Sequence, residues 1–106
     1  MTISHRFIET NGIRMHLVEA GDGPAVLLCH GFFGSWYSWR HQLEALAAAG
    51  YRAIAPDMRG FGQTDKPDAI DQYTLLHLTG DMVGLLDAVG ADQAVIVGHD
   101  WGGPVA

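Results

Sequence analysis

Asp100 is the residue of this sequence whose surroundings most clearly suggest chemistry, in the segment VIVGHDWGGPVA. Gly98 and Gly102 flank it at minus two and plus two, where side chains would collide if a strand turned sharply into a helix. Such a turn presents its central residue at a helix N-terminus, where free N–H groups favour negative charge. A carboxylate is already ionised at neutral pH and needs no base before it attacks. We therefore predict that Asp100 is a nucleophile.

A carboxylate nucleophile suits an sp³ carbon that bears a leaving group, because displacement gives an alkyl ester that water can later cleave at the carbonyl. Epoxides and alkyl halides are such substrates. The alternative is that Asp100 only caps a helix, as aspartates often do. The glycine spacing after an apolar run favours the nucleophile over the cap. His99 is not expected to act as a base, because neighbours on a sharp turn point in different directions.

The elements that would position this turn are those of an α/β sheet. Asn11-Gly12 suits a two-residue hairpin turn between residues 5–10 and 13–20. Three further runs are predicted to be buried strands: Ala25–Cys29, residues 51–57 and Ala94–Gly98. The order hairpin, strand, helix, strand, helix, strand predicts the first half of an open α/β sheet with right-handed crossovers.

Two amphipathic helices are expected between these strands. The first carries Trp39, Leu43 and Leu46 on one face and ends at Gly50. The second follows Thr74 as its N-cap and ends at Gly90. Its apolar face is predicted to hold Leu75, Leu78, Met82, Leu85 and Val89. Gly80 and Gly84, one turn apart, are expected to let this helix approach the sheet closely.

Composition excludes several classes of function. The 106 residues carry a net charge of −6 without a basic cluster, which argues against a nucleic-acid or anionic-membrane partner. The sequence shows neither a signal peptide nor a membrane-spanning run, and its single cysteine, Cys29, is expected to be buried, so we predict a cytoplasmic protein. The six histidines lack metal-ligand spacing, so no metal site is expected.

The sequence resembles the α/β-hydrolase superfamily and, within it, the soluble epoxide hydrolases. The resemblance rests on two segments that occur in the family's order, CHGFFGSWYSWRHQLEALAAAGYRAIAPDMRGFGQTDKP and VIVGHDWGG. Together with the elements between them, the resemblance covers almost the whole chain. It implies that Asp100 opens an epoxide without metal or organic cofactor. It also implies that the backbone N–H groups of Phe32 and Trp101 form an oxyanion hole for ester hydrolysis.

The resemblance also assigns supporting residues. His30 and Gly31 match the family's loop pair, and we expect His30 to brace the loop rather than transfer protons. Phe33 departs from the family pattern, which usually has proline there, often after a cis peptide bond. A trans peptide and an altered loop are therefore expected here. Asp57 and Arg59 match a family loop motif. A surface ion pair is the simple interpretation, and we expect them to brace the loop rather than to take part in catalysis.

The resemblance implies that the catalytic histidine, its partner acid and the lid tyrosines lie beyond Ala106. Residues 1–106 are therefore interpreted as an incomplete core domain that needs a C-terminal segment of the same domain and cannot turn over alone. A small hydrophobic epoxide and water are the expected substrates. A haloalkane dehalogenase with the same nucleophile, a ligand-binding relative and a non-catalytic fragment remain the alternatives.

Overall fold

The computed structural model describes residues 3–31, 34–67, 73, 75–91, 93–99 and 102–105. Its strands are β1 (Ile3–Thr10), β2 (Ile13–Ala20), β3 (Ala25–Cys29), β4 (Arg52–Pro56) and β5 (Ala94–Gly98). They form one sheet in the order β1-β2-β4-β3-β5. β2 pairs antiparallel with β1 and β4, whereas β3 pairs parallel with β4 and β5. The predicted α/β class and the predicted antiparallel hairpin are both confirmed.

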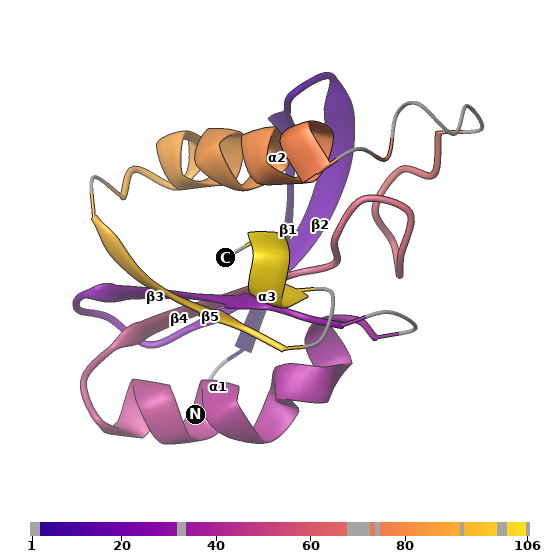
Figure 1. The fold of residues 1–106 in the computed structure, drawn as a ribbon. Helices are drawn as coiled ribbons and strands as arrows, with labels where there is room; N and C mark the ends of the chain where they lie inside the picture. Colours follow the sequence, from indigo (N-terminus) through magenta and orange to yellow (C-terminus); the bar gives the residue numbers. More distant parts are fainter. Residues whose placement is uncertain are drawn as a thin grey trace.

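Helices cover both faces of this sheet (Figure 1). On one face lies α1 (Arg40–Ala48), preceded by the 3₁₀ turn η1 (Trp36–Trp39). On the other lie α2 (Leu75–Ala88) and the short α3 (Gly102–Val105). Because β3 is sandwiched between these layers, all of its residues are buried, as its continuous apolar run predicted.

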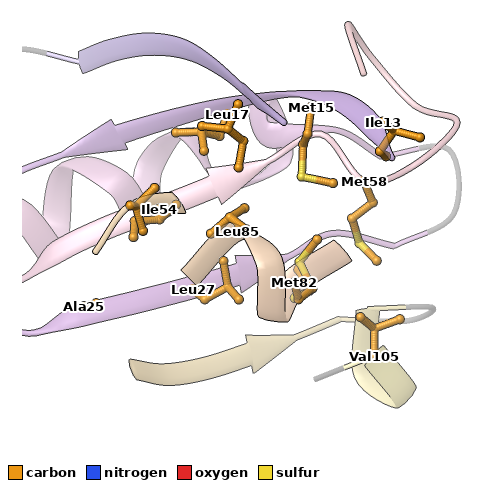
Figure 2. Packing of buried hydrophobic residues seen from close by; sticks show 13 residues of the cluster. Ile13, Met15, Leu17, Ala25, Leu27, Ile54, Met58, Met82, Leu85 and Val105 are labelled. Atoms are coloured by element: carbon orange, nitrogen blue, oxygen red, sulfur yellow. The ribbon is translucent and has the colours of Figure 1, made fainter. Parts of the chain in front are cut away.

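The core has two layers, one on each side of the sheet. Figure 2 shows Leu17, Leu27 and Ile54 of three strands in one cluster with Met82 and Leu85 of α2. The α1 side contains a second cluster formed by Val18, Ala20, Val26, Leu28, Leu43, Ala53 and Ala55. Alternate residues of β3 therefore pack into opposite layers, as expected because successive side chains of a strand point to opposite faces of the sheet.

The hairpin turn forms at the predicted residues. Asn11 and Gly12 both have positive φ, 49° and 82°, and Thr10 pairs with Ile13 across the turn. Positive φ at both central positions is the requirement of the turn type that matches strand twist. The first helix also ends as predicted, since Gly50 has a φ of 91°, and Trp39 and Leu46 pack against the α1-side core.

β5 forms at the predicted residues and pairs parallel with β3, but its residues are not buried as the apolar run predicted. Val95, Ile96 and Val97 are 61%, 41% and 37% exposed. Among the described strands β5 pairs with β3 alone and so lies at the edge of the sheet. Apolar residues of this kind are typical of a strand inside a sheet. β5 has no described strand on the side away from β3, and most of its residues are exposed.

The apolar face of α2 is only partly as predicted. Met82, Leu85 and Val89 are buried, but Leu75 is 50% exposed. Leu75 lies N-terminal to the part of the helix that the hairpin turn contacts, where the Asn11 side-chain amide donates to the His77 carbonyl. The predicted N-cap, Thr74, lies outside the described residues.

Gly84 allows α2 to approach the hairpin closely, as its spacing from Gly80 predicted. A β-carbon at position 84 would lie 2.1 Å from Thr10 Oγ1. That hydroxyl is fixed, because it donates to the Asp81 carbonyl at 2.8 Å. Alanine at position 84 would therefore push the helix away from β1 or break this hydrogen bond.

We expect Gly84→Ala to lower the free energy of unfolding by about 1–3 kcal/mol. The collision outweighs the roughly 1 kcal/mol that alanine normally adds within a helix. Urea denaturation of the purified protein measures the change, with Thr79→Ala, at an exposed position of the same helix, as the control. A Gly84→Ala protein more stable than the parent would contradict the close approach.

Candidate active site

The turn that should carry the nucleophile runs from the end of β5 to the start of α3. Asp100 and Trp101 lie outside the described residues, but the residues on either side define the turn. The N–H of Gly102 donates to the carbonyl of His99 at 2.9 Å, and the N–H of His99 donates to the carbonyl of Cys29 at 3.2 Å. The chain therefore reverses within a few residues, beside the end of β3.

Gly102 lies where no side chain fits. A β-carbon there would be 2.2 Å from the carbonyl oxygen of Cys29 and 2.8 Å from that of His30. Gly98, the other glycine of the spacing, pairs with Cys29 in the sheet. The turn thus packs directly against the Cys29-His30 backbone, and side-chain volume at position 102 would separate the two segments. His99 itself is exposed.

His30 is buried, at 1% exposure, and both of its ring nitrogens are bonded. Nδ1 lies 2.7 Å from the carbonyl of Gly31, which can only accept, so this nitrogen carries the proton. Nε2 accepts the N–H of Met58 at 2.9 Å. Burial lowers the pKa of His30, although the Gly31 carbonyl and the charge of Asp57 act in the opposite direction. A neutral imidazole with both nitrogens occupied supports a bracing role.

This lowered pKa predicts a pH dependence of stability. Below its ordinary value of 6.5, the unfolded chain binds a proton at His30 more readily than the folded chain. The free energy of unfolding is therefore at its full value above pH 6.5, and it decreases as the pH falls towards the pKa of His30 in the folded state. We expect His30→Gln to flatten this part of the curve in urea denaturation between about pH 5 and 7.5. His41→Gln, at an exposed α1 position, is the control, and an unchanged slope in His30→Gln would contradict the assignment.

The carboxylate of Asp57 is a buried acceptor at the end of β4. It accepts the N–H of Trp36 at 2.8 Å, the N–H of Gln63 at 3.1 Å, and a hydrogen bond from His16 Nδ1 at 2.7 Å. Gly62, with a φ of 54°, lets the following loop close over this group, because a β-carbon there would lie 2.3 Å from Cγ of Asp57. Asp57 holds loops together, as preferred from the sequence.

The surface ion pair between Asp57 and Arg59 is a wrong interpretation. Arg59 is 1% exposed and binds Asp81 of α2 instead, with Nε and Nη2 each 2.8 Å from a carboxylate oxygen. Nη2 also donates to the carbonyl of Asn11 at 3.2 Å. Asp81 was not predicted from the sequence. The only signal for it was a single acidic residue among the apolar residues of the buried α2 face.

The described structure places other predicted residues as follows. Gly31 is half-buried beside His30, while Phe32 and Phe33, including the peptide bond between them, lie outside the described residues. Trp36 packs with Trp39 against the α1-side core. Cys29 is fully buried, and burial raises the pKa of its thiol to about 11.

A cavity of about 440 Å³ opens beside the loop pair His30-Gly31. Met58, Phe61, Tyr73 and Leu78 contribute to its wall, which makes it largely apolar. It can accommodate an apolar group close to the turn. Within the described ranges no set of three His, Cys, Asp or Glu side chains gathers as metal ligands. No helix in those ranges is long and apolar enough to cross a bilayer.

Comparison with known proteins gives a consistent result. Residues 24–106 match the family described as alpha/beta hydrolase fold. The chain is 60% identical over 104 residues to Epoxide hydrolase 2 of Siraitia grosvenorii, covering 98% of this chain and 33% of that protein. It is 55% identical over 104 residues to Epoxide hydrolase A of Mycobacterium tuberculosis, covering 96% of this chain and 32% of that protein.

Solved structures agree with these sequence matches. The crystal structure of an epoxide hydrolase from Vigna radiata matches with a TM-score of 0.96 and 55% identity, covering 97% of this chain and 32% of that one. An epoxide hydrolase from an endophytic Streptomyces gives a TM-score of 0.95 and 56% identity, with 98% and 31% covered. The chain thus spans about a third of the length of the relatives that it matches.

Proposed function

Since this chain belongs to the alpha/beta hydrolase fold family, we propose that it is the part of an epoxide hydrolase that carries the nucleophile, Asp100. The observation that supports this most strongly is the turn between β5 and α3, whose His99 N–H is bonded to the Cys29 carbonyl. This bond brings the end of β5 beside the end of β3, where the His30-Gly31 loop begins. The named relatives, at 55–60% identity, point to the same activity.

The proposed reaction has two steps. In the first, a carboxylate oxygen of Asp100 attacks an epoxide carbon and the ring C–O bond breaks. The epoxide oxygen keeps the electron pair and takes a proton, which leaves a hydroxyalkyl ester on Asp100. In the second, water attacks the ester carbonyl and the acyl C–O bond breaks. This step releases the vicinal diol and regenerates the carboxylate after loss of a proton.

The second step needs hydrogen-bond donors at the ester carbonyl oxygen, where negative charge develops. We assign this role to the backbone N–H groups of Phe32 and Trp101. Losing one such donor typically costs on the order of 10² to 10³ in rate. His30, Gly31, Gly98 and Gly102 support the two segments that carry these donors, through the contacts described above.

The activity is best tested in a hybrid protein, because the chain spans only a third of its relatives. Residues 1–106 replace the matching N-terminal third of Epoxide hydrolase 2 of Siraitia grosvenorii. We expect this hybrid to convert styrene oxide to its diol, and mass spectrometry of the quenched reaction to find the substrate mass on the peptide that contains Asp100. The 106-residue chain alone is expected to be alkylated at most once.

Other outcomes of this experiment identify the alternatives. Halide release from a bromoalkane without diol formation would indicate a dehalogenase. Folded hybrid that forms neither diol nor adduct would indicate a ligand-binding relative. Diol formation without any ester on Asp100 would contradict the proposed mechanism, and sustained turnover by the 106-residue chain alone would contradict its interpretation as an incomplete domain.

A further inference from the structure

The loop between His30 and Trp36 is tied at both ends to two adjacent residues. At its N-terminal end, His30 Nε2 accepts the N–H of Met58 at 2.9 Å. At its C-terminal end, Oδ1 of Asp57 accepts the N–H of Trp36 at 2.8 Å. Inside the loop, the N–H of Gly34 donates to the carbonyl of Gly31 at 3.0 Å. Residues 57 and 58 therefore hold the two ends of this loop in place.

The orientation of the Asp57 carboxylate is in turn set by His16 of β2. The two residues are cross-strand neighbours, because the N–H of Asp57 donates to the His16 carbonyl at 2.9 Å. His16 Nδ1 lies 2.7 Å from Oδ2 of Asp57, and both side chains are 1% exposed. His16 thus binds Oδ2, which also accepts the Gln63 N–H, and the other oxygen, Oδ1, faces Trp36.

His16 is itself held from two sides. Its backbone N–H donates to Thr64 Oγ1 at 3.0 Å, and its Nε2 lies 3.0 Å from Nδ1 of His5. The His5 ring also meets the Trp36 ring edge-on, with centroids 5.3 Å apart. A buried group that is bonded this completely keeps a single orientation. A rigid chain of contacts therefore leads from β1 and β2 to the end of the loop.

We propose that His16 and Asp57 are positioning residues for the ester-hydrolysis step, acting through the loop that carries Phe32. This inference rests on the proposed function, in which the Phe32 N–H is one of the oxyanion donors. The structure describes how the two ends of the loop are held, and Phe32 itself lies outside the described residues. Neither His16 nor Asp57 touches the reacting atoms in this scheme.

The two steps of the reaction respond differently to a displaced donor. During alkylation, negative charge leaves the Asp100 carboxylate, so a hydrogen bond to that carboxylate weakens towards the transition state. During hydrolysis, negative charge builds up on the ester carbonyl oxygen, so the same hydrogen bond strengthens. Displacing the loop should therefore slow hydrolysis selectively. A residue with only a general structural role would slow both steps together.

The test uses substitutions of His16 and Asp57 in the hybrid protein. His16→Leu removes the donor to Asp57, whereas His16→Asn places an amide N–H close to where Nδ1 lies. Asp57→Ala removes the acceptor of the Trp36 N–H. Asp65→Ala is the matched control. This exposed carboxylate lies in the segment that follows Asp57, and among the hydrogen bonds of the described residues it accepts only the Arg14 N–H.

Single-turnover mass spectrometry separates the two rate constants, one for the appearance and one for the loss of the Asp100 ester. We expect His16→Leu and Asp57→Ala to slow ester loss about tenfold or more, a fraction of the effect of losing a donor outright. Ester formation should stay within about threefold of the parent, so that ester accumulates. His16→Asn should restore most of the loss, and Asp65→Ala should match the parent in both steps.

Three results would overturn the inference. Equal slowing of both steps would show a general structural role, and unchanged ester loss would show that the loop does not depend on these residues. Equal defects in His16→Asn and His16→Leu would show that the donor to Asp57 is unimportant. If Asp57→Ala fails to fold, the His16 pair decides. A parent hybrid that forms neither ester nor diol would refute the proposed function itself, and with it this inference.

Discussion

Replacing Asp100 with alanine is expected to lower epoxide turnover by the hybrid protein on the order of 10⁴-fold or more, the range seen when a covalent nucleophile is removed. The reason is that the proposed oxyanion donors act on an ester that can no longer form. His99, the adjacent residue, is not expected to take over this role. Its backbone N–H and carbonyl are hydrogen-bonded in the turn, and its side chain is exposed. Initial rates of diol formation measure the effect.

Asp87→Ala is the control for this substitution, since it removes an exposed carboxylate from α2. It should leave turnover unchanged. The Asp100→Ala protein should also show no mass increase on the peptide around position 100. Turnover within about tenfold of the parent would place the nucleophile elsewhere, because losing a covalent nucleophile costs far more than that.

Arg59→Met is expected to lower the free energy of unfolding by about 3–5 kcal/mol. This is the usual cost of removing one partner of a buried ion pair and leaving the other unpaired. Asp81, which is fully buried, would lose the two hydrogen bonds that Arg59 donates. The substitution also removes a hydrogen bond to the Asn11 carbonyl. Urea denaturation of the hybrid measures the change.

Two further proteins make this result specific. The double substitution Arg59→Met with Asp81→Leu should recover much of the loss, because no unpaired charge remains buried. Arg6→Met removes a partner of Glu19 at the surface, where the Arg6 side chain is 40% exposed, and should cost about 1 kcal/mol or less. A single Arg59→Met loss as small as that of Arg6→Met would show that the buried pair contributes little to stability.

The carboxyl of Glu19 illustrates why surface and buried pairs differ here. Burial alone would raise its pKa, but the hydrogen bonds and charges of Arg6 and Arg52 outweigh burial and hold the pKa below its ordinary value. Glu19 therefore has two arginine partners, and Arg52 remains in place when Arg6 is replaced. Asp81 has no such second cation among the hydrogen-bond partners that the structure describes.

Much of the fold could be predicted from the sequence because it depends on local signals. Asn11-Gly12 determined the hairpin, since only positive φ at both positions matches the twist of the strands. The continuous apolar run of β3 indicated burial on both faces, and Gly50 marked the end of α1. The spacing of Gly98 and Gly102 around Asp100 is a local signal of the same kind, and it indicated where the candidate site lies.

The partners of the charged residues could not be predicted in this way. Arg59 and Asp57 are two apart in the sequence, yet they bind Asp81 on α2 and His16 on β2. Such pairs join segments far apart in the chain, so no periodicity or spacing encodes them. The roles of Phe32, Trp101 and Asp100 remain predictions, because these residues lie outside the part of the chain that the structure describes.

The sequence by itself therefore determined the α/β class, the hairpin and the succession of β5 and α3, and it predicts a carboxylate nucleophile between them. Only the tertiary structure decided how far each residue of β5 is exposed, that Arg59 is paired with Asp81, and that Asp57 binds both His16 and the Trp36 N–H. The physical reason is that backbone propensities and apolar periodicity act within a few residues. Burial and ion pairing, in contrast, depend on which distant segments the completed sheet brings into contact.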